Sequence, residues 1–344
     1  MKFDYIVGNP PYQEDSTNTS DKPVYDLFMD CAETIADKVE LITPARFLFN
    51  AGKTNSKWNE KKLNDIHFKI LQYYKNSSDV FAGTDITGGI AISYMDKLKK
   101  FEIIGTFTPY DELNSILQKV HRKSFISLAT VIESSDIYKF TSEFHEKYPN
   151  AKTILSRGHE NSLTSNVLEK LPFAFYKEKD DSKKLISIVG RQDNKRIKLW
   201  IEKEYIKDIR NLHGYKVILP KSNGSKPITD GIKTPVIGEP LKGYPNMGYT
   251  QTFISIGPFK TESEMENVFK YVKTKFCRAL IGTLKITQHN ATKTWLNVPI
   301  QNFTSSSDID WSKSISDIDQ QLYEKYNLSK DEISFIENHI KEMA

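Results

Sequence analysis

Four residues near the start of the chain combine a stiff backbone with hydrogen-bond acceptors. Asn9, Pro10, Pro11 and Tyr12 come directly after the apolar run at 3–8. Each proline fixes φ and restricts the residue before it, so this stretch is rigid. The Asn9 side-chain oxygen and the Pro10 carbonyl can then accept both N–H bonds of one amino group, while Tyr12 stacks on a flat ring that carries the amine. Such bonding localises the amine lone pair and directs it at an electrophilic methyl group.

Alternating strand and helix patterns surround this stretch. The run at 3–8 predicts a strand, because two prolines cannot continue a β-ladder. Apolar residues at helical spacing predict helices at 25–36 and 59–66, and further strands are predicted at 39–44, 67–74 and 86–94. This alternation is typical of an α/β sheet, and ligands bind such sheets at the carboxyl ends of the strands.

The pattern changes after residue 105. Residues 107–148 are predicted to be mostly helical, and 185–259 to form short strands with Gly and Pro turns. A helix is predicted at 261–282 and another at 315–326. Ser329-Lys-Asp-Glu332 has the form of a capping box that opens a last helix.

The loop and three later segments resemble the gamma class of adenine-specific DNA methyltransferases, in particular the methylase and target-recognition part of type IIG restriction–modification enzymes. The later segments are Tyr25–Phe28, 41–47 and Val80-Phe81. The resemblance implies that Asn9, Pro10, Pro11 and Tyr12 are the catalytic residues. It also implies that Tyr12 and Phe81 pack on opposite faces of an adenine flipped out of the duplex.

The same resemblance implies an α/β fold in three parts. Residues 1–105 would be the C-terminal half of a Rossmann-like methyltransferase sheet, 106–304 an α+β target-recognition domain with a helical linker, and 305–344 a helical tail. The implied function is that of a site-specific, adenine-specific DNA methyltransferase. It would move a methyl group from S-adenosylmethionine to the exocyclic amino group of adenine within a restriction–modification system.

A binding motif for S-adenosylmethionine is absent from the sequence. In the family a Gly-rich strand–turn precedes the catalytic loop, and here eight residues precede Asn9. The glycines at 83–89 come before a predicted strand and open no helix, so they do not fit that geometry. The cofactor-binding residues are therefore unknown, and we expect a second polypeptide to supply that half of the sheet. A truncated fragment that cannot catalyse alone is the rival interpretation.

Double-stranded DNA is the expected partner of the middle of the chain. Between Lys183 and Lys226 there are twelve lysines and arginines against four acids, although charge alone also fits a solvated face. The candidate phosphate-binding residues of this basic stretch are Arg191, Lys195, Arg196 and Lys198. Trp295 is expected to pack in a core.

Composition narrows the function classes. Hydrophobic residues make up 38% and charged residues 27% of the 344 residues, and no apolar run approaches the ~20 residues of a membrane helix. The chain is therefore expected to be cytoplasmic, without a membrane partner. The two cysteines form no CxxC pair and are expected to be reduced core thiols, without a metal. Two alternatives stay open: a catalytically inactive, sequence-specific DNA-binding subunit, and a methyltransferase that acts on RNA or protein.

Overall fold

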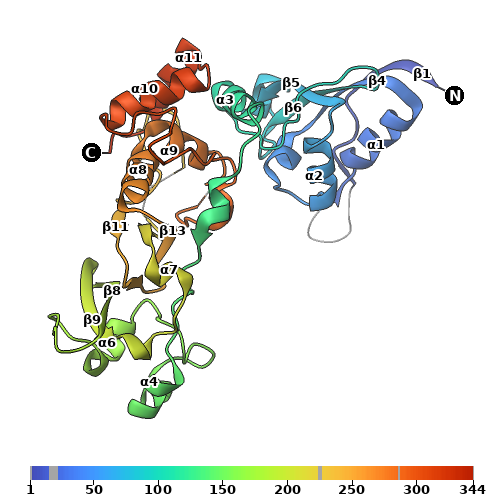
Figure 1. The fold of residues 1–344 in the computed structure, drawn as a ribbon. Helices are drawn as coiled ribbons and strands as arrows, with labels where there is room; N and C mark the ends of the chain where they lie inside the picture. The colour runs from blue at the N-terminus through green and yellow to red at the C-terminus, as the bar shows by residue number, and fades with distance from the viewer. Residues whose placement is uncertain (1, 15–21, 224–226, 286, 344) are drawn as a thin grey trace. The chain divides into compact units, whose positions relative to one another are not determined.

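Residues 2–14, 22–223, 227–285 and 287–343 are described by a computed structural model. The chain divides into two units, Met1–Arg122 and Lys123–Ala344 (Figure 1). Each unit contains helices and strands, so the prediction of a mixed α/β fold is confirmed. The assignment of the first unit to half of a Rossmann-like sheet stays a prediction. In the described ranges no helix is long and apolar enough to cross a membrane.

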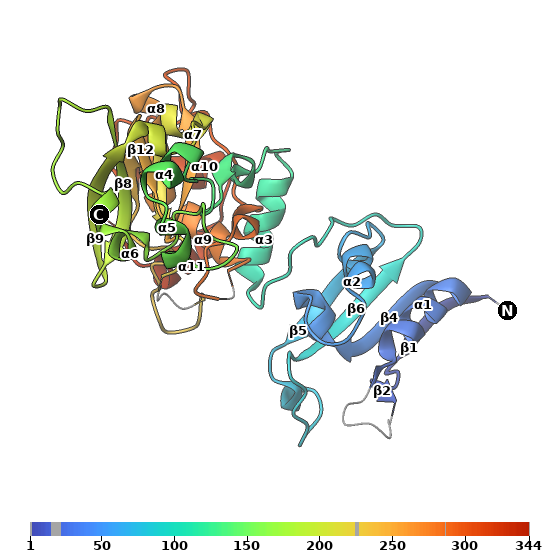
Figure 2. The same cartoon turned by 90° about the horizontal axis from the view of Figure 1, so that it is seen from below.

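The first unit is built on a four-stranded sheet with the order β1-β4-β6-β5 (Figure 2). β1 (Phe3–Gly8) runs parallel to β4 (Ala36–Pro44), with Tyr5 opposite Lys38. β6 (Ile90–Asp96) is antiparallel to both of its neighbours, β4 and β5 (Phe68–Tyr74). β1 is therefore an edge strand among the described residues.

One face of this sheet is a core and the other is not. Along β4, the buried residues Val39, Leu41 and Thr43 alternate with half-exposed ones, as a strand with one packed face requires. Helices α1 (Tyr25–Ile35) and α2 (Ser56–Leu63) share the core cluster of the packed face.

The first unit extends to Arg122 and includes an aromatic cluster on the sheet and one further helix. The Phe107 ring lies 5.4 Å from that of Tyr73 and 5.5 Å from that of Phe49, centroid to centroid. Helix α3 (Asp111–His121) follows and buries an apolar stripe of Leu113, Ile116, Leu117 and Val120. The functional roles assigned to 1–105, 106–304 and 305–344 stay predictions.

The second unit holds two larger sheets, with the orders β11-β10-β13-β7 and β12-β8-β9. In the first, the central strands are antiparallel. In the second, β8 and β9 form a long hairpin. The strands are β7 (Ile132–Glu133), β8 (Leu185–Gln192), β9 (Lys195–Glu202), β10 (Tyr215–Pro220), β11 (Leu241–Gly243), β12 (Met247–Tyr249) and β13 (Phe253–Phe259).

Two terminal helices, α10 (Ile315–Lys325) and α11 (Lys330–His339), pack on α9 (Lys275–Gly282). The buried Asp319 carboxylate accepts hydrogen bonds from the backbone N–H groups of Lys275 and Phe276, each at 2.9 Å, and so caps the start of α9. α11 opens with the expected capping box of Ser329 and Glu332.

Some local predictions were wrong, each because a long-range or capping contact overrides periodicity. Residues 107–148 are largely irregular: α3 and α4 (Ser142–Lys147) are joined by loops and by β7, whose Glu133 pairs with Ser255 of β13. The helix at 261–282 is two helices, α8 (Glu262–Lys273) and α9, because the Thr274 hydroxyl caps α9 by accepting from the Cys277 N–H. Cys277 is buried as expected, but Cys31 is exposed.

Lys216 of β10 is a fully buried cation whose ammonium group donates to the Gly214 carbonyl at 3.1 Å. Burial lowers its pKa from 10.5 to about 7. Between these pKa values the unfolded chain binds a proton that the folded chain does not, so this lysine makes the free energy of unfolding rise with pH above 7. We expect Lys216→Met to stabilise the protein by about 2 kcal/mol at pH 7.

That advantage over the wild type should shrink as the pH is raised from 7 to 10, which urea unfolding at several pH values would measure. Lys233→Met, a change at an exposed lysine of the same unit, serves as the control. An advantage of Lys216→Met that stays constant with pH would contradict the assignment.

Candidate active site

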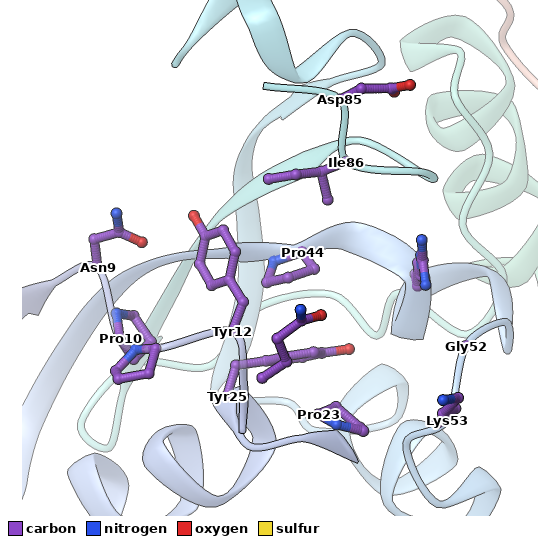
Figure 3. Close-up of a pocket in the computed structure, with 13 residues that line it drawn as sticks. Asn9, Pro10, Tyr12, Pro23, Tyr25, Pro44, Gly52, Lys53, Asp85 and Ile86 are labelled. Carbon is purple, nitrogen blue, oxygen red and sulfur yellow. The ribbon is translucent and has the colours of Figure 1, made fainter. Parts of the chain in front are cut away.

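The Asn9–Tyr12 loop lies at the carboxyl edge of the first sheet, beside an open cavity of about 810 Å³ (Figure 3). β1 and β4 are parallel and both end here, β1 at Gly8 and β4 at Pro44. The segments that follow the two strands therefore meet and form two walls of the cavity. The lining residues are Asn9, Pro10, Pro11, Tyr12, Gln13, Pro23, Tyr25, Pro44, Arg46, Gly52, Lys53, Asp85 and Ile86.

Tyr12 has an unusual environment. Its hydroxyl is buried, yet no described residue forms a geometrically satisfactory hydrogen bond with it. Burial raises the pKa of Tyr12, and the neighbouring Asn9 side chain opposes that rise. A buried hydroxyl without a partner costs about 1–3 kcal/mol, which a partner from outside the described residues, such as a water molecule or a ligand, would offset. In Figure 3 the ring stands between Asn9 on one side and Pro44 on the other.

The upper wall of the cavity is Ile86, which the sequence analysis did not single out. Its position is fixed by Ser77, whose hydroxyl accepts from the Ile86 N–H at 2.8 Å and donates to the Thr84 carbonyl at 2.9 Å. Phe81 lies in the segment 77–86, which these hydrogen bonds hold in place. Its side chain is half-buried and does not line the cavity. The structure thus brings Asn9, Pro10, Pro11 and Tyr12 together but leaves Phe81 outside, so the predicted role of Phe81 stays a prediction.

Arg46 forms another wall of the cavity, and its side chain packs closely against Gly88. Its Nε donates to the Thr87 carbonyl at 2.5 Å. A Cβ on Gly88, at φ +91°, would stand 2.8 Å from the Arg46 Cγ, and a Cβ on Gly89, at φ +80°, would stand 2.2 Å from the Tyr74 carbonyl oxygen. These glycines therefore allow a close approach of backbone and side chain at the start of β6, rather than the binding of a phosphate.

We expect Gly89→Ala to destabilise the first unit by about 3 kcal/mol or more, because the added methyl group meets a backbone oxygen that cannot move alone. Gly83→Ala is the matched control: Gly83 has φ +78° with nothing within 4 Å of a Cβ, so it should cost only about 1 kcal/mol of backbone strain. Thermal melting of both variants measures the difference. Equal losses would show that the approach to Tyr74 does not constrain the fold.

The charges of the described lining residues do not suit S-adenosylmethionine. The charged side chains that line the cavity are Arg46 and Lys53 against one acid, Asp85, an excess of positive charge that does not suit a cationic sulfonium group. Tyr12, Tyr25, prolines and Ile86 contribute apolar and aromatic surface to the other walls. By charge, the described lining residues therefore do not form a binding site for S-adenosylmethionine. No cluster of side chains in these same ranges could hold a metal ion.

The predicted DNA-binding residues lie on the β8–β9 hairpin of the second unit. Its turn is formed by Asp193 and Asn194, both with positive φ, as a tight hairpin turn requires. Arg191 and Arg196 are directly opposite each other, and both line a second cavity of about 620 Å³. Lys195 and Lys198 do not line it, and the Lys198 ammonium lies 5.4 Å from the centre of the Trp200 ring. Lys226, the end of the basic stretch, is outside the described residues, and Trp295 is fully buried as expected.

Comparison with known proteins agrees with the resemblance seen in the sequence. Residues 1–81 match the model of the family described as Eco57I restriction-modification methylase. An "uncharacterized adenine-specific methylase" of Mycoplasma pneumoniae (strain ATCC 29342 / M129 / Subtype 1) is 32% identical over 95 residues, which cover 26% of this chain and 22% of that protein. The chain thus spans about a fifth of this relative's length.

Among solved structures, the type IIG restriction endonuclease BpuSI aligns with 97% of this chain and 52% of its own, at 9% identity and a TM-score of 0.32, too low a score to bear on the fold. The family match falls on the unit that carries the Asn9–Tyr12 loop and its cavity. The chain thus resembles restriction-modification methylases in that unit, and one relative that it matches in sequence is described as an adenine-specific methylase.

Proposed function

We propose that this chain carries the acceptor site of an adenine-specific DNA methyltransferase of a restriction–modification system. The observation that carries the proposal is the rigid Asn9–Tyr12 loop at the carboxyl edge of a parallel strand pair, where all four of its residues line one open cavity. The match of residues 1–81 to a restriction-modification methylase family supports the choice of DNA over RNA or protein.

In this proposal the chain's own residues hold the adenine. The Asn9 side-chain oxygen and the Pro10 carbonyl accept the two N–H bonds of the exocyclic amine, and Tyr12 stacks on the ring. S-adenosylmethionine, when bound, supplies the electrophilic methyl group. Positioning of this kind can contribute several kcal/mol to catalysis without a covalent intermediate. Phe81 would stack on the other face of the ring only if the segment pinned by Ser77 rearranges when a base enters.

We expect Asn9→Ala to lower DNA adenine methylation by the assembled enzyme at least a hundredfold, because one of two acceptors for the amine is lost. DNA binding should persist, since Asn9 is exposed and supports no core contact. Asn64→Ala, a change at an exposed asparagine at the end of α2, is the control and should retain full activity. Methylation is measured by transfer of a radiolabelled methyl group to duplex DNA. Retention of activity by Asn9→Ala would refute the assignment.

We infer that the donor site comes from polypeptide that adds to the first sheet, and the outer edge of β1 is suited to this. On that strand the side chains of Phe3 and Tyr5 are 43% exposed and that of Val7 is 71% exposed, although all three are apolar or aromatic. An edge strand also offers unpaired N–H and C=O groups to a new strand. On α1, Leu27 and Phe28 are exposed as well. We propose that a strand carrying the donor site pairs with β1 and covers these side chains.

This proposal predicts that residues 1–344 alone give no measurable heat with S-adenosylmethionine in titration calorimetry at micromolar concentrations. The physical reason is that Arg46 and Lys53 outnumber the single acid, Asp85, among the charged residues of the cavity, which disfavours a cationic ligand. Binding with a dissociation constant below about 10 µM, roughly −7 kcal/mol, would contradict it. If the chain binds DNA but no added polypeptide restores methylation, the result would instead support the alternative of an inactive DNA-binding subunit.

A further inference from the structure

The second cavity, which we name the basic groove, is assembled from parts of the second unit that are far apart in sequence. The β8–β9 hairpin, the segment after β10, the turn before β13 and the segment at 287–289 each contribute to its walls. Its basic side chains are Arg191, Arg196, Lys221 and His289 against one acid, Glu239, and its amide side chains are Asn223, Gln251 and Gln288. Gln251 and Gln288 lie outside the basic stretch at 183–226, so charge along the sequence does not reveal them.

Backbone hydrogen bonds hold these walls together. The Lys221 N–H donates to the Thr252 carbonyl at 2.9 Å, and the Lys221 carbonyl accepts from the Asn290 N–H at 2.7 Å. Ser222 forms an isolated antiparallel bridge with His289. The Gln251 N–H donates to the Leu163 carbonyl at 2.8 Å. The side chains of the groove therefore project from a backbone that hydrogen bonds hold rigid. Because a rigid backbone has little freedom to lose, less entropy is lost when a ligand binds.

The groove concentrates positive charge at one place. Arg191 and Arg196 are directly opposite each other across the hairpin, and like charges in that position destabilise a sheet. The Arg196 guanidinium donates to the Glu239 carbonyl, and burial together with Arg191 lowers the pKa of Arg196. Arg191 itself is exposed. A ligand with acceptor or anionic groups would relieve this repulsion.

Two glutamines add groups that can distinguish bases. The Gln251 amide nitrogen donates to the Asp136 carboxylate at 2.6 Å, which fixes the direction of that amide, and Gln288 is exposed. In the DNA major groove, glutamine pairs with the donor and acceptor of adenine and arginine with the two acceptors of guanine. A groove that holds both residue types can therefore discriminate between base pairs as well as bind phosphate.

We propose that the basic groove reads base edges of duplex DNA, with Arg191 and Gln288 as specificity-determining residues. The proposal rests on the proposed function and adds the surface that selects the sequence to be methylated. Arg196 and Lys221 supply charge and position around these two side chains, and Gln251 is the second amide reader. Lys195 and Lys198, outside the groove, would contact phosphates and would not affect sequence preference.

The test is selection of duplexes from a random pool by the full chain, followed by sequencing of the bound fraction and fluorescence anisotropy with the enriched duplex and a scrambled one. We expect Gln288→Ala to lower affinity for the enriched duplex roughly tenfold or more and to relax preference at one position, with affinity for the scrambled duplex unchanged within twofold. Arg191→Ala should relax a different position. Gln192→Ala is the matched control, since Gln192 is an exposed glutamine of the same hairpin that does not line the groove, and it should leave the enriched sequence unchanged.

The outcomes separate this proposal from the catalytic one. The proposed role of the groove is overturned if wild type, Gln288→Ala and Arg191→Ala all enrich the same sequence. It is also overturned if the wild-type chain enriches no sequence, or if it binds duplex RNA as tightly as DNA. If the variants shift the enriched sequence while no assembled enzyme methylates it, the groove stands and the proposed chemistry fails. If Asn9→Ala enriches the wild-type sequence but has lost methylation, both proposals are supported.

Discussion

The parallel pairing of β1 with β4 is the contact on which the candidate active site depends. Because the two strands run the same way and both end in proline-containing turns, the segments after them converge at one edge of the sheet. Asn9 and Tyr12 come from one of these segments, and Pro44 and Arg46 from the other. An antiparallel arrangement would have put these residues at opposite ends of the sheet. The prolines stiffen the loop, and the Val24 N–H at the start of α1 donates to the Tyr12 carbonyl at 3.2 Å.

Local sequence predicted much of the first unit because local chemistry determines it. Prolines end β1 and β4, apolar residues at helical spacing form α1, and a capping box opens α11 in the second unit. The Asn9–Tyr12 loop was found for the same reason. What the sequence did not reveal depends on contacts between distant residues. Ile86 reaches the cavity because Ser77 pins its backbone, and Arg46 does so because Gly88 has no side chain.

The second unit was harder to predict since its organisation is set by pairings between distant residues. Glu133 pairs with Ser255, more than a hundred residues away, and so belongs to a strand. For this reason the prediction of mostly helix at 107–148 was wrong. The basic stretch was visible as charge, but only the folded chain brings Arg191 and Arg196 beside Gln251 and Gln288. Equally, only the structure shows that Cys31 and the outer face of β1 are exposed.

The way in which the basic groove is assembled has a consequence for how such a protein evolves. Its walls are joined by backbone bonds, those of Lys221 to Thr252 and Asn290 among them, which do not depend on the identity of the side chains that face the groove. Arg191 and Gln288 are exposed and stand on separate segments, so each can be exchanged without disturbing the other or the core. In the proposed base-reading role, single codon changes at these two positions would alter the preferred sequence one base pair at a time and leave the cavity of the first unit, on its own sheet, untouched.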